Sequence, residues 1–185
     1  KPNHYSVHVN FSDVDSPAAL DLIGWKPDIP SGKVKGELRT SGNRFNPSGW
    51  FDYESRAEGQ DILGRIRGIK GSYNLNGDVL SLHDIEARTR KSILTANGDM
   101  DLASSSISSL HVRLKTTDVT DVTLPYRREL HGLGEFAGKV TGRFNDPFIE
   151  GKVSISEAAY EDYNLGNIIG SVAYKKDLLE IWDLS

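Results

Sequence analysis

The sequence contains no cysteine among its 185 residues, so disulfide bonds and thiolate metal ligands are excluded. No apolar run approaches the ~20 residues that a helix needs to cross a bilayer. The chain also lacks the Gly-x-Ser-x-Gly turn of hydrolases, the phosphate-binding P-loop and the Gly-x-Gly-x-x-Gly turn of dinucleotide-binding proteins. Because no other catalytic signature replaces them, we predict that the protein is not an enzyme.

The chain also lacks a large excess of either charge: it has 26 acidic and 22 basic residues, and the net charge is −4. General nucleic-acid binders show a basic face, so we expect no nucleic-acid partner. Two interpretations of the one basic cluster stay open: a solvated outer surface, or a rim that contacts phosphate headgroups. This cluster consists of Arg65, Arg67, Lys70, Arg88, Arg90 and Lys91.

Metal-binding patterns are scarce. The five histidines form neither a His-Glu-x-x-His motif nor a His-x-His pair, and we expect them on the solvated surface. Neighbouring acidic residues such as Asp13 and Asp15 lack the further oxygen ligands and the glycine turn of a calcium loop. We assign them to turns and caps, and predict that the chain uses no metal and no cofactor.

What the sequence does contain is a repeat whose segments return in the same order and at nearly the same spacing. Repeats of this kind form stacked, extendable architectures. We expect a first unit at 1–109 and a second, truncated unit at 110–185, within one continuous sheet and as a piece of a longer protein. The matched segments are 7–14 with 112–119, 32–36 with 138–142, and 71–85 with 170–184.

Most of the chain alternates between apolar and polar residues with a period of two, as in Val112-Arg113-Leu114-Lys115. This pattern is typical of strands in a sheet with one apolar face. Turn signals such as Asn-Gly and Asn-Asp-Pro separate the runs. Many short strands joined by tight turns predict an all-β fold, a long antiparallel meander.

One short helix is expected at about 16–24. Ser16 can cap its first turn, Pro17 suits the first helical position, and Gly24 suits its end. The matching stretch at 124–136 is a weaker helix candidate, because Gly132 and Gly134 interrupt it.

Two segments together suggest a family. The segment 142–153, which reads GRFNDPFIEGKV, resembles a strand pair of the TamB and AsmA-like envelope proteins, in which glycine, proline and glycine recur at this spacing. The segment 15–42, with its short helix, loop and Gly-x-Val-x-Gly strand, resembles a second recurrent part of the same family. As a periodic pattern, the resemblance covers nearly the whole chain.

The resemblance implies a long antiparallel sheet curved into a half-pipe, called a β-taco, with an apolar concave face. Proteins of this family are anchored in the inner membrane of Gram-negative bacteria and cross the periplasm toward the outer membrane. They are implicated in phospholipid transport between these membranes, and TamB also in outer-membrane protein assembly with its barrel partner TamA. The resemblance therefore implies a periplasmic location, acyl chains as ligand, and a TamA-type barrel that meets parts outside this chain.

Physical chemistry is consistent with such a ligand. An open apolar trough would far exceed the few hundred Å² of apolar patch that is normal on a monomer, and such patches mark binding surfaces. Withholding each CH₂ from water is worth ~0.8 kcal/mol, so exposing a sixteen-carbon chain costs on the order of 10 kcal/mol. We expect the following residues to line the groove: Val7, Val9, Phe51, Tyr53, Ile66, Leu80, Leu82, Val112, Leu114, Val140, Phe144, Val153, Ile155 and Ile181.

A second interpretation stays open: a structural or adhesive β-repeat of a surface protein, with both faces of the sheet covered and no ligand. The two interpretations differ in the state of the inner face. In a structural repeat this face would be a tightly packed core without water, whereas in a lipid-binding protein it would be open to a ligand. Exposed edge strands tend to pair between molecules. An edge-strand dimer of this chain is therefore a further expectation.

Overall fold

The computed structural model describes residues 5–16, 31–43, 45–55, 65–122, 130–176 and 178–185. They form one antiparallel sheet whose strand order is the order of the sequence, which confirms the predicted all-β meander. A 3₁₀ turn, η2 (Val119–Asp121), lies between the seventh and eighth strands. The strands are β1 (Tyr5–Asp15), β2 (Gly32–Gly42), β3 (Ser48–Ser55), β4 (Gly68–Asn76), β5 (Val79–Arg88), β6 (Ser92–Asp101), β7 (Ser106–Thr116), β8 (Leu130–Arg143), β9 (Asp146–Tyr160), β10 (Tyr163–Lys175) and β11 (Leu178–Trp182).

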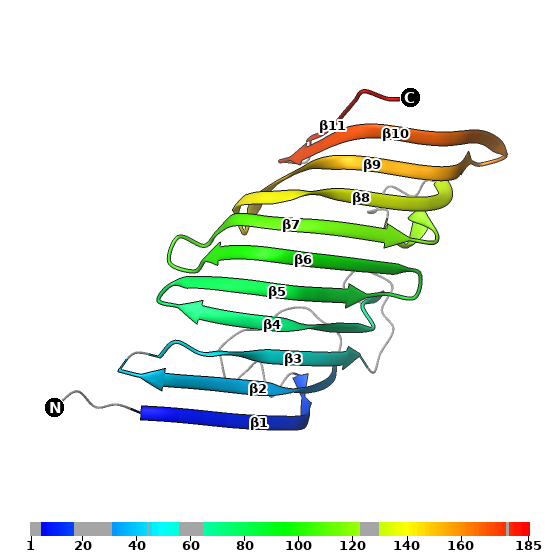
Figure 1. Ribbon diagram of the computed structural model, residues 1–185. Coiled ribbons are helices and arrows are strands. Elements are labelled where there is room, and N and C mark those ends of the chain that lie inside the picture. The colour runs from blue at the N-terminus through cyan, green and yellow to red at the C-terminus, as the bar shows by residue number, and fades with distance from the viewer. Residues whose placement is uncertain (1–4, 17–30, 44, 56–64, 123–129, 177) are drawn as a thin grey trace.

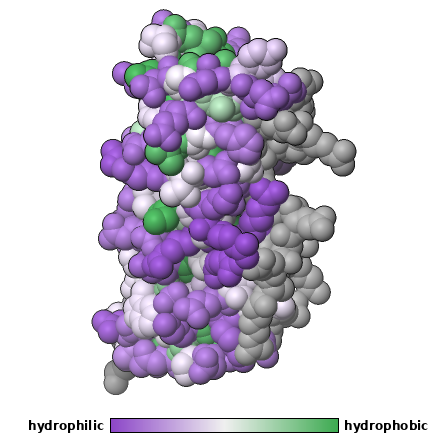
Figure 2. Space-filling view, turned by 90° about the vertical axis from the view of Figure 1, so that its right-hand side faces the viewer, coloured by the Kyte–Doolittle hydropathy of each residue, from purple (hydrophilic) through white to green (hydrophobic). Residues whose placement is uncertain are grey.

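The sheet is open, with β1 and β11 at opposite edges (Figure 1). The sheet is at most partly curved. Seen from the side, the molecule shows hydrophilic residues over much of its surface, with hydrophobic patches at several heights (Figure 2). The described strands thus form a single sheet whose two faces have to be considered separately.

Burial is limited in this fold. Among the described residues, the buried apolar side chains are small or lie near strand ends, whereas large side chains at the two edges stay open to solvent. Val9 in β1 is 45% exposed and Ile181 in β11 is 49% exposed. The stability of the sheet therefore depends mainly on contacts between side chains of neighbouring strands. The buried apolar residues are Tyr53, Ala96, Val119, Ala158 and Ala173.

Bulges keep apolar side chains on one face where the alternation breaks. In β5, the register shifts between Leu82 and Ile85, and the backbone of Asp84 adopts φ +50°. The amide of Asp84 donates a hydrogen bond to Oδ1 of Asn97 in β6, at 2.6 Å. Because the bulge inserts one extra residue, Leu82 and Ile85 share a face although they are three positions apart.

The sequence repeat appears in the sheet as strands six positions apart. The matched segments relate β1 to β7, β2 to β8, and the β4–β5 hairpin to the β10–β11 hairpin. Asp84 and the matching Asp183 both adopt positive φ, +50° and +53°. The division into units at 1–109 and 110–185 stays a prediction.

The expected helix at about 16–24 lies outside the described residues except for Ser16. The hydroxyl of Ser16 is buried and accepts a hydrogen bond of 3.0 Å from the amide of Gly32. The weaker helix candidate is wrong from residue 130 onward, because that part belongs to β8. There Gly134 pairs with Thr116 of β7, and a Cβ on Gly134 would lie 2.6 Å from a methyl group of Val119.

Candidate functional site

One face of the sheet is apolar from edge to edge. Residues directly opposite each other on paired strands share a face, so the register links Val9 to Leu38, and further pairs continue this face to Ile181. The rings of Phe51 and Tyr73 lie 6.5 Å apart on it. We call it the apolar face, and its members include Val7, Val9, Phe11, Val34, Leu38, Phe51, Tyr53, Ile69, Tyr73, Leu80, Leu82, Ile85, Leu94, Leu110, Val112, Leu114, Phe136, Val140, Ile149, Val153, Ile155, Ile168, Val172, Leu179 and Ile181.

All but two of the predicted groove residues lie on the apolar face. Ile66 precedes β4 and is outside the strands. Phe144 is 43% exposed and lies in the turn between β8 and β9. The reason is that Arg143 pairs with Asp146, which leaves only Phe144 and Asn145 for the turn.

Sequence reasoning missed several members of the apolar face, including Phe11, Ile85, Phe136 and Ile149. The missing signal for Ile85 is its three-residue spacing from Leu82, which indicates a bulge. For the aromatic residues the signal is a glycine on the neighbouring strand or two positions along the same strand, because a ring can lie over the bare backbone there.

Four such ring-over-glycine contacts occur on the apolar face of the described strands. A Cβ on Gly36 would lie 2.7 Å from Cζ of Phe11, and one on Gly32 would lie 2.4 Å from Cε2 of Tyr53. A Cβ on Gly138 would lie 2.5 Å from Cζ of Phe136, and one on Gly151 would lie 2.7 Å from Cε2 of the same ring. The Gly-x-Val-x-Gly segments thus supply glycines that leave room for aromatic rings, while the central valine adds to the apolar face.

The opposite face of the sheet is mostly polar and carries ion pairs, although the apolar side chains of Trp50, Ile93 and Ile169 are exposed on it as well. Lys35 and Asp52 pair at 3.1 Å, and Lys70 and Glu86 pair at 3.3 Å. The hydrogen bond from Lys35 to Asp52 raises the pKa of Lys35. The two faces therefore differ in chemistry, and only the apolar face carries apolar side chains on every strand of the sheet.

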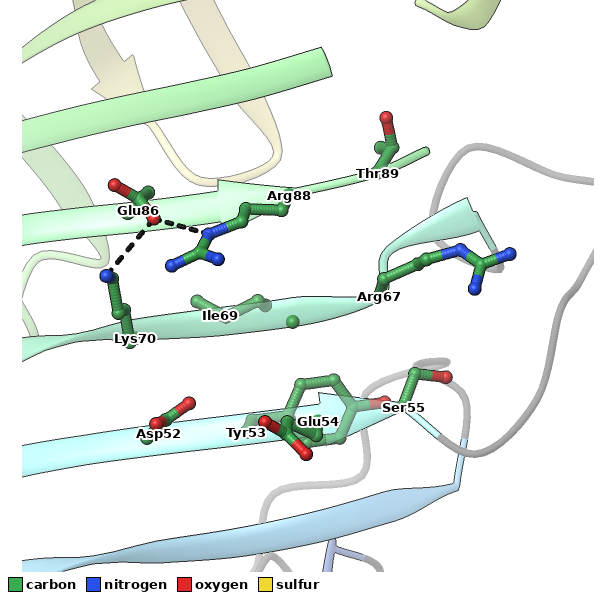
Figure 3. A pocket seen from close by; sticks show the side chains of 11 residues that line it. Asp52, Tyr53, Glu54, Ser55, Arg67, Ile69, Lys70, Glu86, Arg88 and Thr89 are labelled. Carbon is green, nitrogen blue, oxygen red and sulfur yellow. Dashed lines mark hydrogen bonds and ion pairs between the residues drawn. The ribbon is translucent and has the colours of Figure 1, made fainter. Parts of the chain in front are cut away.

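A shallow depression of about 540 Å³ lies at the ends of β3, β4 and β5. Within it Glu86 is held between Lys70 and Arg88, whereas Arg67 points away from them (Figure 3). The hydrogen bond from Arg88 is the main cause that lowers the pKa of Glu86. Charged and polar side chains line most of this depression, so it offers little surface to an acyl chain.

At least four members of the predicted basic cluster have acidic or carbonyl partners. Lys70 and Arg88 both pair with Glu86, and Lys91 pairs with Asp118 at 2.7 Å. Arg65 donates from Nη1 to two backbone carbonyls of η2, at 3.3 and 3.2 Å. These contacts favour the solvated-surface interpretation of the cluster over a rim for headgroups.

A polar network joins η2 to β6 and β7. The hydroxyl of Ser92 is buried and lies 2.8 Å from that of Thr116, and Ser92 also bonds to the carboxylate of Asp121 at 2.5 Å. Asp118 accepts a hydrogen bond from the amide of Thr120 at 3.0 Å and so caps η2. Each of these groups bonds to another member of the network. We therefore assign the network a structural role, in which it holds η2 against β6 and β7.

No protein-family model matches the chain, and comparisons with curated proteins and with solved structures give no significant match. Among the described residues, no helix has the length and apolar character that crossing a bilayer requires. The relation to the TamB and AsmA-like proteins therefore stays a resemblance.

Proposed function

We propose that the chain is a segment of an envelope protein whose apolar face shields the acyl chains of phospholipids as they move between the inner and outer membranes. The single observation that carries this proposal is the chemistry of the two faces. Apolar side chains from all eleven strands share one face of an open sheet, while ion pairs cross the other.

The energetics favour a hydrocarbon ligand over a polar one. Each CH₂ withheld from water contributes ~0.8 kcal/mol, whereas a polar headgroup loses free energy when it leaves water without a partner. Strands stack at ~4.8 Å, so eleven of them give a strip roughly 50 Å long. Along such a strip an acyl chain can stay in contact with apolar side chains while its headgroup stays in solvent.

The remaining parts of the proposal rest on the resemblance alone. They are a periplasmic location, an inner-membrane anchor, a role in outer-membrane protein assembly and a TamA-type barrel as partner. In this proposal the protein conducts or shields lipid and catalyses no reaction.

The proposal is tested by photo-crosslinking from neighbouring positions of one strand. Leu114 and Lys115 are adjacent in β7, but the register places them on opposite faces. A benzophenone amino acid at position 114 should label phospholipid in vesicle-incubated protein, and the same group at position 115 should not. Equal labelling at both positions, or none at either, would contradict the proposal, and no labelling would favour a structural β-repeat.

A further inference from the structure

The polar face of the sheet holds another shallow depression, in the middle of the sheet, whose charges do not cancel. It has a volume of about 580 Å³ and lies over β6, β7, β8 and β9. Arg113 and Lys139 line it, and Glu150 is the one acidic residue among the described residues of its lining. Lys152 borders it, because this residue lies directly across from the lining residue Ala137. Three positive charges and one negative charge give this place a net charge of +2, in a chain whose net charge is −4.

The depression at the ends of β3, β4 and β5 has a different charge balance. Its lining holds equal numbers of basic and acidic side chains, namely Arg67, Lys70, Arg88, Asp52, Glu54 and Glu86. Their formal charges sum to zero, and Lys70 and Arg88 already bind Glu86. Positive charge that is not compensated locally is thus a property of the depression over β6–β9.

The basic side chains of Arg113, Lys139 and Lys152 have no hydrogen-bond or ion-pair partner in the described part of the chain. On the same face, Lys115 pairs with Glu135 at 3.0 Å. Arg113 and Lys152 are also exposed to solvent, and Lys139 is partly exposed. The N–H donors of all three side chains are therefore available to an anion from solution.

The small side chain of Ala137 leaves open space between these cations. The register places Arg113 of β7 and Lys152 of β9 directly across from Ala137, one on each side. Because strands lie ~4.8 Å apart, the backbones of Arg113 and Lys152 are roughly 10 Å from each other. Lys139 is two positions along β8 and shares the face of Ala137. Three long basic side chains can therefore approach one group above the methyl of Ala137 from three sides.

Asn97 adds a neutral donor to the lining of the depression. Its Oδ1 already accepts a hydrogen bond from the amide of Asp84, at 2.6 Å. The side-chain amide of an asparagine also carries two N–H donors. What Asn97 can offer a ligand is therefore an N–H group, which suits an anion and not a cation.

We propose that this depression binds a phosphate group, held by Arg113, Lys139 and Lys152. A guanidinium can donate two parallel hydrogen bonds to phosphate oxygens, and the two lysines add point charges. A phosphate monoester carries nearly two negative charges at pH 7, which matches the net charge of +2 better than a single carboxylate does. The site is on the face opposite the apolar face, so the inference goes beyond the proposed lipid function and does not depend on it.

The test is a titration of the protein with pyrophosphate, followed by the backbone amide signals of Ala137 and Lys139 in NMR spectra. Both signals should shift, and Arg113→Gln and Lys152→Gln should each weaken binding about tenfold, because each variant loses a charged hydrogen-bond donor. The matched control is Lys35→Gln, which removes the same charge from the same face where Lys35 pairs with Asp52. This control should bind pyrophosphate as the parent does.

A further variant, Ala137→Leu, fills the space between the cations without changing the charge and should abolish binding. Because the NMR spectrum of each variant also reports whether the sheet is intact, a loss of binding is not confused with unfolding. No shift with pyrophosphate, an equal loss in Lys35→Gln, or unchanged binding in Ala137→Leu would overturn the proposal.

A second arm identifies the source of the phosphate group by flotation with vesicles of phosphatidic acid or of phosphatidylcholine. If the group belongs to a lipid headgroup, the protein floats with phosphatidic acid, and Arg113→Gln releases it. If the group belongs to a soluble compound, pyrophosphate binds but flotation does not respond to Arg113→Gln. Vesicle binding through the apolar face is recognised because it is the same for the parent and for this variant.

Discussion

Asp118 joins η2 to the loop before β6 through an ion pair with Lys91 and a hydrogen bond from the amide of Thr120. Burial alone would raise the pKa of Asp118, but the hydrogen bonds from Lys91 and Thr120 outweigh it and lower the pKa to about 2. The folded-state pKa is therefore below the value in the unfolded chain. The stabilisation from this carboxylate is complete above about pH 4 and is lost as the pH falls through about 2.

We predict that Asp118→Asn lowers the free energy of unfolding by about 1 kcal/mol at pH 7. Urea unfolding at pH 7 and at pH 2.5 measures the effect, and the difference between variant and parent should shrink at the lower pH. The control is Asp99→Asn, because exposed Asp99 only meets the hydroxyl of Ser81 at the surface. An equal loss at both pH values would count against the assigned role.

Thr40 is 4% exposed and lies on the apolar face opposite Val7. Its hydroxyl is buried without a hydrogen-bond partner among the described residues. A buried hydroxyl without a partner has lost its hydrogen bonds to water and gained none in the protein. Removing it in Thr40→Val should therefore raise the free energy of unfolding by about 1 kcal/mol. Thr95→Val is the matched control, since Thr95 on the polar face donates to a backbone carbonyl; a stabilisation of equal size there would contradict the interpretation.

At the scale of single strands, the bulges decide which side chains reach the apolar face. We predict that Asn97→Ala lowers the free energy of unfolding by about 1 kcal/mol, since the amide of Asp84 loses its acceptor. Asn167→Ala should cost less, because its contact with Glu157 is longer, at 3.4 Å. Urea unfolding and hydrogen exchange at Asp84 provide the measurements, and unchanged exchange at Asp84 would refute the proposed contact.

The strands themselves could be predicted because the period-two alternation in β7 and β9 is visible in the sequence. The faces of most groove residues followed from the same alternation. The spacing of Leu82 and Ile85 indicates that a bulge lies between them, but its exact position could not be predicted, because an acidic residue at positive φ, such as Asp84, has no distinctive sequence pattern. Phe144 was misplaced relative to the apolar face for a similar reason, as the pairing of Arg143 with Asp146 moves it into a turn.

The sequence also could not reveal which charges meet. The basic residues looked like one cluster, but Glu86 lies between Lys70 and Arg88 only because β4 and β5 pair in this register. Likewise, the sequence indicates Gly132 and Gly134 as breaks in a helix, whereas in the structure Gly134 allows β8 to approach η2 closely. Both outcomes depend on contacts between residues that lie far apart in the sequence.

At the scale of the whole molecule, the proposed function depends on the difference between the two faces of the sheet. Val153 and Ser154 are neighbours in β9, and the register places Val153 on the apolar face and Ser154 on the polar face. The same substitution at both positions therefore introduces the same charge at nearly the same place in the sheet. We predict that Val153→Arg abolishes lipid binding, because a guanidinium does not tolerate contact with an acyl chain, and that Ser154→Arg preserves it.

The most direct test is native mass spectrometry of the purified protein and these two variants, with lipids extracted from the same samples and circular dichroism to verify the sheet. We predict phospholipid at a defined stoichiometry on the parent protein and on Ser154→Arg, and none on Val153→Arg. A parent protein that stays free of lipid after incubation with phospholipid vesicles, or a Val153→Arg variant that retains lipid, would contradict this prediction.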